Sequence, residues 1–413
     1  MIQKIKGTMD ILPNETPLFR YVEGVMREEA EKYGYGEIRT PTFENTELFV
    51  RGVGDTTDVV QQEMYTFSDR EENRSISLRP EGTASVARAI IENGKFSDPM
   101  PLKYYYIISC FRHEKPQAGR SREFFQFGTE TFGSNNPTSD ATVIALASSV
   151  LQRLGLKKVK LHVNSIGCKE CRPAYREALV SYFTERIDRL CPTCKERLKK
   201  NPLRLLDCKN PECHEIAVEA PKTVEHLCDS CSHGFDMLKS ALDEMGIEYV
   251  VDTGIVRGLD YYTGVVFEFI AEGIGAQSTV CGGGRYDGLV ESLGGPALSG
   301  IGFGMGITRV ILAMREAGVD KIEEKRPALY VAALGERAMI KALGIVERQR
   351  QSGVYAECDI VGRSLKAQMK YANKIGAKYT LIIGDSEIDI GRAQLRNMES
   401  GEQTEVEIAS FTL

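Results

Sequence analysis

The sequence predicts an α+β fold, in which an antiparallel sheet carries a cysteine-rich insertion and a small α/β domain follows at the C-terminus. Three observations support this prediction. Residues 103–111 and 122–131 are two strand-like runs on either side of a polar loop, as in a long antiparallel hairpin. Eight of the 11 cysteines lie between Cys168 and Cys231. After Pro327, short apolar runs alternate with helical segments.

The chain has the size and composition of a multidomain globular protein. Its 413 residues are 42% hydrophobic, which is enough to bury a core in each of two or three domains. No stretch approaches the ~20 apolar residues of a membrane span, and the N-terminus lacks the apolar part of a signal peptide, so we expect a cytoplasmic protein with no membrane partner. The formal net charge of −6 argues against a basic coat for nucleic acid but permits a local basic surface.

The N-terminal elements are predicted from periodicity. Residues 15–33 place apolar side chains at helical spacing and predict an amphipathic helix. Residues 37–44 have the pattern of a strand interrupted by Pro41, which fits a sheet edge or a subunit interface, where no ladder donor is needed. The hairpin comes next, and the helix after it is predicted to be capped near Thr138 and Ser139.

The cysteine-rich segment is predicted to interrupt one sheet. A strand is predicted before it, at 159–164, and strands resume after it at 248–251, 265–270 and 300–307. The cysteines are clustered in this segment, which indicates metal binding or reduced thiols rather than a disulfide framework.

A charged stretch at 315–326 marks a linker to a final unit. That unit has short apolar strands at 328–334, 354–358 and 379–384, the pattern of a small parallel α/β domain. The predicted division is a sheet domain in two parts, 1–165 and 247–322, an insertion, 166–246, and a C-terminal domain, 327–413.

The second strand of the hairpin carries the residues of a candidate binding site. The chain contains neither a GxxxxGK[ST] loop nor a strand followed by GxGxxG, so a nucleotide site would have to be built otherwise. The side-chain period of a strand puts Phe124, Gln126, Gly128 and Glu130 on one face. Phe124 and Glu130 would lie roughly 20 Å apart at ~3.3 Å per residue, about the span of an extended aminoacyl-adenylate.

Arginines gather at the open end of this hairpin. Arg112 ends the first strand, and Arg120 and Arg122 precede the second, so positive charge is predicted where phosphates would lie. Arginines standing alone would instead favour a solvated basic loop.

A glycine-rich strand offers a second surface. Between residues 300 and 307, glycines alternate with Ile301, Phe303, Met305 and Ile307. The apolar set is predicted to face the core, and the glycines to leave bare backbone on which a planar ring can lie. Glycines in a strand can also mean a bulge or tight packing, although four at a period of two are hard to explain that way.

These residues carry a family resemblance. Three segments resemble the motifs of class II aminoacyl-tRNA synthetases: the region around Pro41, motif 1; Phe111-Arg112-His113-Glu114 with Arg122-Glu123-Phe124, motif 2; and residues 302–309, motif 3. Three more resemble the histidyl-tRNA synthetase family: residues 257–262, its histidine signature, and residues 78–83 and 282–287. The resemblance extends across the chain. It implies a class II antiparallel-sheet catalytic domain with an inserted cysteine-rich domain and a C-terminal α/β anticodon-binding domain.

The resemblance implies roles at the ATP end of the site. Arg112 would hold the α-phosphate and Phe124 would stack on adenine. Arg309 would clamp the other face of adenine and the γ-phosphate, which Arg120 would also approach. Mg²⁺ would accompany the nucleotide.

The resemblance also implies a histidine-binding set: Glu81, Thr83, Gln126, Glu130, Arg257, Tyr261 and Tyr262. Glu130 and Tyr262 would bond the two imidazole nitrogens, and Arg257 would lie between the histidine carboxylate and the α-phosphate. Arg257 and Arg112 would then be the catalytic residues.

The implied activity is ATP-dependent ligation of histidine to its tRNA through a histidyl-adenylate, by a homodimer. Two other functions are weighed against it. A non-catalytic synthetase-like regulatory subunit of ATP phosphoribosyltransferase tends to lack the histidine signature and the C-terminal domain, and both are present here. A zinc-dependent nucleic-acid-binding module would explain the cysteines but neither the arginine hairpin nor the glycine strand.

The cysteine spacings predict structural zinc sites in the insertion. They are Cys168-x2-Cys171-x19-Cys191-x2-Cys194 and Cys208-x4-Cys213-x14-Cys228-x2-Cys231, and each fits the two-pair pattern of a Cys₄ site. The first reading is two sites grouped in this order. An interleaved pairing, a single site using His214, His226 or His233, and reduced thiols in a domain that folds without metal remain open.

Overall fold

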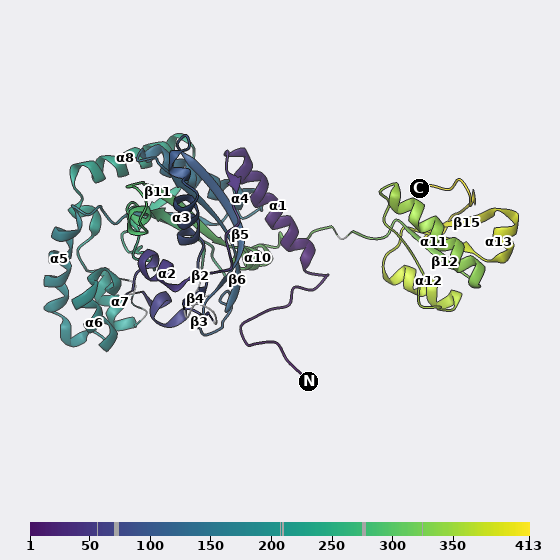
Figure 1. Cartoon of the computed structure of the whole chain (residues 1–413), viewed down its shortest axis with the longest axis horizontal. Coiled ribbons are helices and arrows are strands. Elements are labelled where there is room, and N and C mark those ends of the chain that lie inside the picture. The colour runs from purple at the N-terminus through teal and green to yellow at the C-terminus, as the bar shows by residue number, and fades with distance from the viewer. Residues whose placement is uncertain (56, 70–73, 207, 209, 275–277, 324) are drawn as a thin grey trace. The chain divides into compact units, whose positions relative to one another are not determined.

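The computed structural model describes the whole chain apart from residues 56, 70–73, 207, 209, 275–277 and 324. The chain forms two compact units, Met1–Ile322 and Glu323–Leu413 (Figure 1). The predicted α+β class is confirmed, because the first unit is built on a largely antiparallel sheet with helices on its faces. None of the described helices is long and apolar enough to cross a membrane.

The main sheet of the first unit contains the predicted hairpin. Its strands occur in the order β1 (Gly36–Glu37), β5 (Leu102–Phe111), β6 (Glu123–Phe132), β11 (Gly300–Gly306), β10 (Thr279–Arg285), β9 (Thr263–Ile270), β7 (Lys160–Ser165) and β8 (Tyr249–Val251). β5 pairs antiparallel with β6, so that Tyr106 lies opposite Gly128. β11 pairs antiparallel with the other side of β6, with Gly302 opposite Glu130. The hairpin and the glycine strand are therefore neighbours.

The two faces of this sheet differ. One face packs against α1 (Thr16–Lys32), α4 (Pro137–Arg153), α8 (Asp229–Glu244) and α10 (Ile307–Glu316), and forms the largest apolar core. Alternate residues of β5 and β6 face the other side, where α3 (Thr83–Glu92) and α9 (Leu289–Ser292) cover a smaller core. The predicted site residues of β6 lie on this second face.

Two predictions of local structure before the insertion are corrected. Residues 37–44 are not one interrupted strand, because β1 ends at Glu37 and β2 (Phe43–Asn45) belongs to a separate sheet with β4 (Ser75–Leu78) and β3 (Thr66–Ser68). Between them, Arg79 donates Nη1 hydrogen bonds to the carbonyl oxygens of Thr40 at 2.8 Å and Pro41 at 3.1 Å, in place of a strand ladder.

The second correction concerns the cap of α4. The N-cap is Asn136, whose Oδ1 accepts from the Thr138 amide at 3.0 Å, and Thr138 and Ser139 lie inside the helix. Pro137 explains the difference, because proline suits the first helical position, where its missing N–H is not needed.

The insertion lies between β7 and β8 and is mainly helical. It contains α5 (Arg172–Thr184), α6 (Pro192–Lys200), the 3₁₀ turn η4 (Pro202–Leu205) and α7 (Pro211–Val218), while α8 returns to the core of the sheet. Its own small core includes Tyr175, Leu179 and Phe183 beside buried cysteines. The four-part domain division of the chain stays a prediction.

The C-terminal unit has its own mixed sheet. β12 (Leu329–Ala333) is parallel to β13 (Ala356–Cys358) and β14 (Tyr379–Ile383), as predicted, with α11 (Glu336–Gln351) and α12 (Leu365–Lys374) between them in sequence. The antiparallel strands β15 (Arg392–Asn397) and β16 (Gln403–Glu407), preceded by α13 (Asp385–Ile390), were not predicted. The predicted linker begins within α10, and its residue 324 lies outside the described residues.

Candidate active site

The glycine strand β11 lies beside β6 and faces two ways. Ile301, Phe303, Met305 and Ile307 are buried in the main core, which confirms that half of the prediction. The bare backbone on the other side is not open to a ligand ring along its whole length. A Cβ at Gly300, Gly302 or Gly304 would overlap the side chains of Tyr286, Glu130 and Gln126, respectively.

The glycines of β11 therefore make room for the protein's own polar groups. Only at Gly306, among the four, would a Cβ meet ordinary contacts, with Arg309 atoms at 3.7 Å and beyond. The expected platform for a planar ring is thus restricted to this end of the strand.

Glu130 lies at the centre of a buried polar cluster. Its side chain is wholly buried, and its carboxylate accepts hydrogen bonds from the hydroxyls of Thr83 at 2.7 Å, Tyr106 at 2.9 Å and Tyr286. Gly82 and Gly128 leave the space that the Tyr106 ring fills. A substrate group could bond this carboxylate only beside these hydroxyls or in place of one of them.

The environment of Glu130 favours its neutral form. Burial raises the pKa of Glu130 to about 8, and the hydrogen bonds from Tyr286 and Thr83 oppose this shift without cancelling it. The nearby carboxylate of Glu81 raises the pKa further. Proton exchange at this carboxyl is therefore brought close to neutral pH.

Glu81 is held at the beginning of α3. Its two carboxylate oxygens accept from the amides of Thr83 at 2.6 Å and Ala84 at 2.9 Å. Burial nevertheless raises the pKa of Glu81 above its ordinary value. The helix N-terminus supplies donors that suit the ionised form, so this carboxyl is positioned with little freedom.

A cationic cavity of about 470 Å³ lies next to this cluster. Its lining includes six of the predicted residues: Arg112, Arg120, Phe124, Gln126, Arg257 and Arg309. The guanidinium of Arg112 lies 5.3 Å from the centre of the Phe124 ring. Burial, with Arg120 and Arg112 beside it, lowers the pKa of Arg309. Cations that repel one another in a cavity indicate a site for a polyanion.

Backbone carbonyls fix two of the three arginines predicted to contact phosphates. Arg112 donates from Nε to the Pro80 oxygen at 2.9 Å. Arg309 donates from Nε to the Gly119 oxygen at 2.8 Å and from Nη1 to the Thr279 oxygen at 3.0 Å. Each side chain is therefore oriented before any ligand binds.

Arg257 is paired with a residue that sequence reasoning missed. Its Nη1 forms an ion pair with Glu268, which also accepts from the Thr279 hydroxyl at 2.7 Å. Burial disfavours the charge of Arg257, but Glu268 and Tyr262 raise its pKa. Gly282 allows this position, because a Cβ there would overlap the guanidinium.

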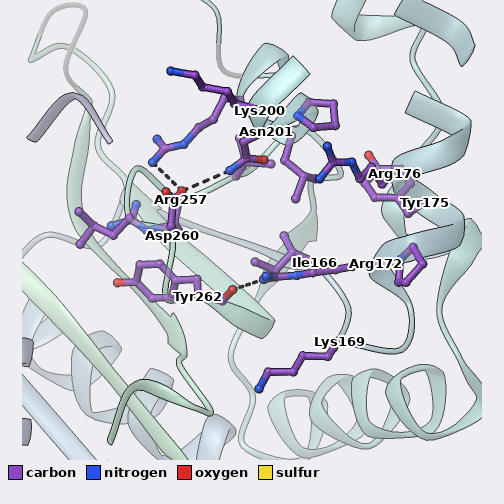
Figure 2. A pocket seen from close by; sticks show the side chains of 16 residues that line it. Ile166, Lys169, Arg172, Tyr175, Arg176, Lys200, Asn201, Arg257, Asp260 and Tyr262 are labelled. Atoms are coloured by element: carbon purple, nitrogen blue, oxygen red, sulfur yellow. Dashed lines mark hydrogen bonds and ion pairs between the residues drawn. The ribbon is translucent and has the colours of Figure 1, made fainter. Parts of the chain in front are cut away.

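The structure divides the predicted residues into three groups. The six above line the cationic cavity. Glu81, Thr83 and Glu130 form the buried cluster on the same face of the sheet, and the Tyr261 ring lies 5.7 Å from that of Tyr286. Tyr262 instead lines a second cavity of about 560 Å³, which it shares with Arg257 (Figure 2). Arg257 thus borders both cavities.

Tyr106, Tyr286 and Glu268 had signals in the sequence. Tyr286 falls in residues 282–287, which were noted for the resemblance but given no role. Tyr106 lies opposite Gly128 in the predicted hairpin, so its neighbourhood could be inferred from register. Glu268 is the one charged residue in the apolar strand β9, and an isolated carboxylate there implies a nearby cation.

The cysteines of the insertion form two groups that correct the predicted pairing. Cys168, Cys171, Cys228 and Cys231 lie together, and so do Cys191, Cys194, Cys208 and Cys213. We call the first group the base quartet and the second group the inner quartet. The sequential grouping was wrong. The grouping is also not interleaved but nested, with the outer two pairs together and the inner two pairs together, because both ends of the insertion return to the sheet. In the described part of the chain, neither group includes a histidine.

Both quartets have the geometry of a tetrahedral thiolate site. The four sulfur atoms of each lie within 4.8 Å of one another. The Sγ atoms of Cys168 and Cys171 are 3.6 Å apart, those of Cys168 and Cys228 are 3.9 Å apart, and those of Cys191 and Cys208 are 4.0 Å apart. Thiolates bound at ~2.3 Å to a tetrahedral Zn²⁺ lie about 3.8 Å apart, so the donor set fits this ion.

Comparison with known proteins gives a consistent result along the chain. The family described as histidyl-tRNA synthetase matches residues 7–310, and the family described as anticodon binding domain matches residues 328–412. The histidine–tRNA ligase of Acetivibrio thermocellus is 51% identical over 99% of this chain and 98% of its own. That of Caldanaerobacter subterraneus is 50% identical over 97% of this chain and 96% of its own.

Solved structures agree. The apo histidyl-tRNA synthetase of S. aureus superposes with a TM-score of 0.84 at 38% identity, covering 99% of this chain and 98% of that one. An ATP phosphoribosyltransferase regulatory subunit/histidyl-tRNA synthetase from Bacillus halodurans has a TM-score of 0.67 at 24% identity, over 93% of this chain and 98% of that one, which shows a shared fold alone. The chain belongs to the histidyl-tRNA synthetase family.

Proposed function

We propose that this protein ligates L-histidine to its tRNA through a histidyl-adenylate, releasing pyrophosphate and then AMP. One observation carries the proposal: a cavity lined by arginines and Phe124 adjoins a buried carboxylate cluster on the same face of the sheet. The first suits the nucleotide and the second suits the amino acid. Identity of about 50% to histidine–tRNA ligases over nearly the whole chain supports the same activity.

At the nucleotide end, charge neutralisation is the main task. Arg112 would hold the α-phosphate, Arg309 and Arg120 would hold the γ-phosphate, and Phe124 would stack on adenine. The cavity lining also contains the carboxylates of Glu114 and Glu268. Carboxylate and phosphate oxygens are the ligands that Mg²⁺ prefers, so the cavity fits a nucleotide that carries this ion.

At the histidine end, Glu81, Thr83 and Gln126 would receive the α-amino group. Glu130 and Tyr262 would bond the imidazole nitrogens, with Tyr261 packed beside Tyr262 at 4.7 Å between ring centres. An amino acid without the imidazole would leave buried polar groups unpaired, and this is the proposed source of selectivity.

Catalysis needs no protein nucleophile. The substrate carboxylate attacks the α-phosphorus in line, and Arg257, which borders both cavities, would stabilise the charge that develops between the two substrates. A ribose hydroxyl at the tRNA 3′ end then attacks the carbonyl of the adenylate, and AMP leaves. The C-terminal unit, which matches the anticodon binding domain family, would read the tRNA.

Amino-acid-dependent ATP–pyrophosphate exchange tests the proposal. Exchange stimulated by histidine, and by no other amino acid, is the expected result, followed by charging of histidine tRNA. Exchange with another amino acid, or with none, would contradict it. The regulatory-subunit alternative predicts no exchange at all and is not favoured, since the signature at 257–262 and the C-terminal unit are both present.

We further propose that the protein acts as a cytoplasmic homodimer. The class II motifs and the edge position of β1, which ends four residues before Pro41, support an interface at this edge of the sheet.

We also propose that the base and inner quartets each bind one structural Zn²⁺. The sulfur separations and the absence of any disulfide among the cysteines, all of which are described, support this. The insertion has a small core of its own, so metal binding would contribute directly to its folding. Metal analysis of protein purified without chelator is expected to find about two zinc ions per chain.

A further inference from the structure

The segment that carries the histidine signature has no regular structure of its own. Residues 252–262 connect β8 to β9 and contain neither helix nor strand. We call this segment the signature loop. The core of the first unit contributes some hydrogen bonds to it: the Asn164 side chain donates to the Ile255 oxygen at 3.0 Å, and the Asp260 amide donates to the Val53 oxygen at 3.0 Å. The loop conformation depends on such bonds from its neighbours.

The insertion supplies further bonds to the same loop. Arg204, in η4, donates from Nη2 to the Gly258 oxygen at 2.7 Å and to the Asp260 carboxylate at 3.0 Å. Asn201 donates from Nδ2 to the same carboxylate oxygen at 3.3 Å. Figure 2 shows Asn201 reaching Asp260 across the cavity between the insertion and the loop.

Among these contacts from the insertion, the one made by Arg172 reaches a residue assigned to histidine binding. Arg172 is the first residue of α5, and its Nη2 donates to the backbone oxygen of Tyr262 (Figure 2). Its Nε is buried without a hydrogen-bond partner. Burial lowers the pKa of Arg172, and the nearby carboxylate of Asp260 opposes this shift. A buried cation aimed at a carbonyl oxygen makes a strong, directional bond.

This bond fixes the backbone at the residue that presents a substrate-binding ring. The Tyr262 side chain is 6% exposed and lies beside Arg257, whose guanidinium is 5.6 Å from the ring centre. Val256, Arg257 and Leu259 line both cavities, so the loop forms the wall between them. On its insertion side the loop borders a cavity of about 560 Å³ rather than a packed core. The bonds across that cavity therefore hold the wall in place.

We propose that Arg172 and Arg204 are positioning residues, through which the insertion holds the signature loop in the conformation that binds histidine. The proposal rests on the proposed roles of Tyr262 and Arg257. It assigns the insertion a part in amino acid activation, before any tRNA is bound. Neither arginine touches the substrate, and both act through backbone or carboxylate oxygens of the loop.

The test compares Arg172→Met, Arg172→Lys and Arg204→Met in ATP–pyrophosphate exchange. Loss of a hydrogen bond from a charged donor is expected to raise the KM for histidine about tenfold in each methionine variant. The KM for ATP should stay within about twofold, because the three arginines assigned to the phosphates lie outside the signature loop. Arg172→Lys should recover part of the loss, since an ammonium group can still donate to the Tyr262 oxygen.

Arg176→Met is the matched control. Arg176 lies one turn further along α5, and its Nη2 donates to the Lys199 oxygen, within the insertion, at 3.2 Å. Its removal should leave the KM for histidine unchanged. Hydrogen exchange in the free protein gives a readout independent of activity: amides of residues 256–262 should exchange faster in Arg172→Met than in Arg176→Met.

Three outcomes would contradict the proposal. An unchanged KM for histidine and unchanged amide hydrogen exchange in both methionine variants would remove the two arginines from this role. A parallel rise in both KM values with a lower melting temperature would reduce their role to folding. Suppose that Tyr262→Phe left the KM for histidine unchanged while Arg172→Met accelerated amide hydrogen exchange in the signature loop. The contact between Arg172 and the loop would then stand, and the assignment of Tyr262 to histidine binding would fail.

Discussion

At the scale of single residues, three largely buried ionisable side chains of the candidate site have partners before any substrate arrives. Glu130 is held by three hydroxyls, Glu81 by two amides, and Arg257 by Glu268. Buried polar groups without partners are costly, so these pairs stabilise the free protein while they orient the side chains. Removing one side chain of such a pair should therefore affect activity and also lower stability, because its partner stays buried without a hydrogen bond.

Arg257→Ala is predicted to fold and to lose most adenylate formation. Removal of a donor aimed at developing charge costs roughly 2.7–4 kcal/mol, which slows exchange about 10²- to 10³-fold. Arg257→Lys should be intermediate, because it keeps the charge and loses the planar fork. Exchange at a near-normal rate in a folded Arg257→Ala variant, as judged by melting temperature, would remove Arg257 from the mechanism.

Glu130→Gln is predicted to weaken histidine binding. The amide keeps the size of the side chain but cannot accept at both ends from the surrounding hydroxyls and an imidazole. The KM for histidine should rise at least about tenfold, with the KM for ATP little changed. A defect confined to the KM for ATP would reverse the assignment of the two ends of the site.

The same carboxyl predicts a pH dependence of stability. Burial raises the pKa of Glu130 from 4.5 to about 8, so the folded protein binds a proton there that the unfolded chain has lost. The stability from this group is complete below about pH 4.5 and is lost as pH rises toward 8, by at most about 1.4 kcal/mol per pH unit. Denaturant unfolding at pH 5, 6, 7 and 8 should show this loss in the wild-type chain. Glu130→Gln should show a shallower decline, and equal slopes would contradict the shift.

At the scale of elements, the active site depends on strands packed closely enough for side chains to lie over bare backbone. In β11, Gly302 and Gly304 face the side chains of Glu130 and Gln126 in β6, and in β10, Gly282 faces the guanidinium of Arg257. This arrangement places carboxylates and rings directly against the backbone of a neighbouring strand. It also makes particular glycines intolerant of even a methyl group.

Gly302→Ala is predicted to damage the site by displacing Glu130. Its Cβ would overlap the Glu130 carboxylate and the Thr129 backbone. The expected cost is about 1–3 kcal/mol of unfolding free energy together with weaker histidine binding. Gly24→Ala is the control, because a Cβ at this position in α1 meets nothing within 4 Å. A Gly302→Ala protein with normal stability and a normal KM for histidine would show that β11 can shift.

The grouping of the cysteines can be tested by counting zinc in double variants. Cys168→Ser/Cys228→Ser removes two members of the base quartet, so about one zinc ion should remain. Cys168→Ser/Cys191→Ser damages both quartets and should leave none. The sequential grouping predicts the opposite pair of results, so the two double variants control each other.

Elements with strong periodicity could be predicted from the sequence, and elements rich in glycine or fixed by distant contacts could not. The β5–β6 hairpin and the glycine strand β11 were predicted, because each alternates clearly between two faces. β10 was missed, since three successive glycines at 282–284 lack the side chains that mark a strand. The partners of Glu130 and Arg257 come from residues more than ten positions away, and local spacing does not reveal them.

The resemblance supplied site residues that periodicity alone did not. The hairpin pattern had already placed Arg112 and Phe124 at the candidate site, and the resemblance added Arg257 and Arg309, which share a cavity with them in the structure. It did not supply the cysteine grouping, because sequence order favours neighbouring pairs while the fold brings the two ends of the insertion together. Topology, not spacing, decides such cases.

At the scale of the whole molecule, a compact unit with the active site is joined to a second unit with its own core. The formal net charge is −6, while the cavity assigned to ATP is lined by several arginines. An acidic body with a local basic cavity limits non-specific binding of nucleic acid and attracts phosphate where it is needed.

Metal removal is predicted to unfold the insertion and leave the C-terminal unit intact. The core of the insertion, around Leu179 and Phe183, also includes cysteines of the inner quartet. Loss of the metal would therefore disrupt the quartet and this core together. After incubation with a strong chelator, limited proteolysis should cut first within residues 166–246. A fragment containing residues 323–413 should persist. Equal resistance with and without chelator would end the zinc proposal.

The nesting of the two quartets sets an order of events during synthesis on the ribosome. The inner quartet is complete once Cys213 has emerged, whereas the base quartet must wait for Cys231, 18 residues later. At roughly 5–20 residues per second, that interval is about 1–4 seconds. If each quartet binds zinc as proposed, a nascent chain can therefore bind its first ion while the base of the insertion is still open. The base quartet is complete at Cys231, before β9, β10 and β11 have been synthesised, so a second ion could close the insertion before the catalytic sheet has all its strands.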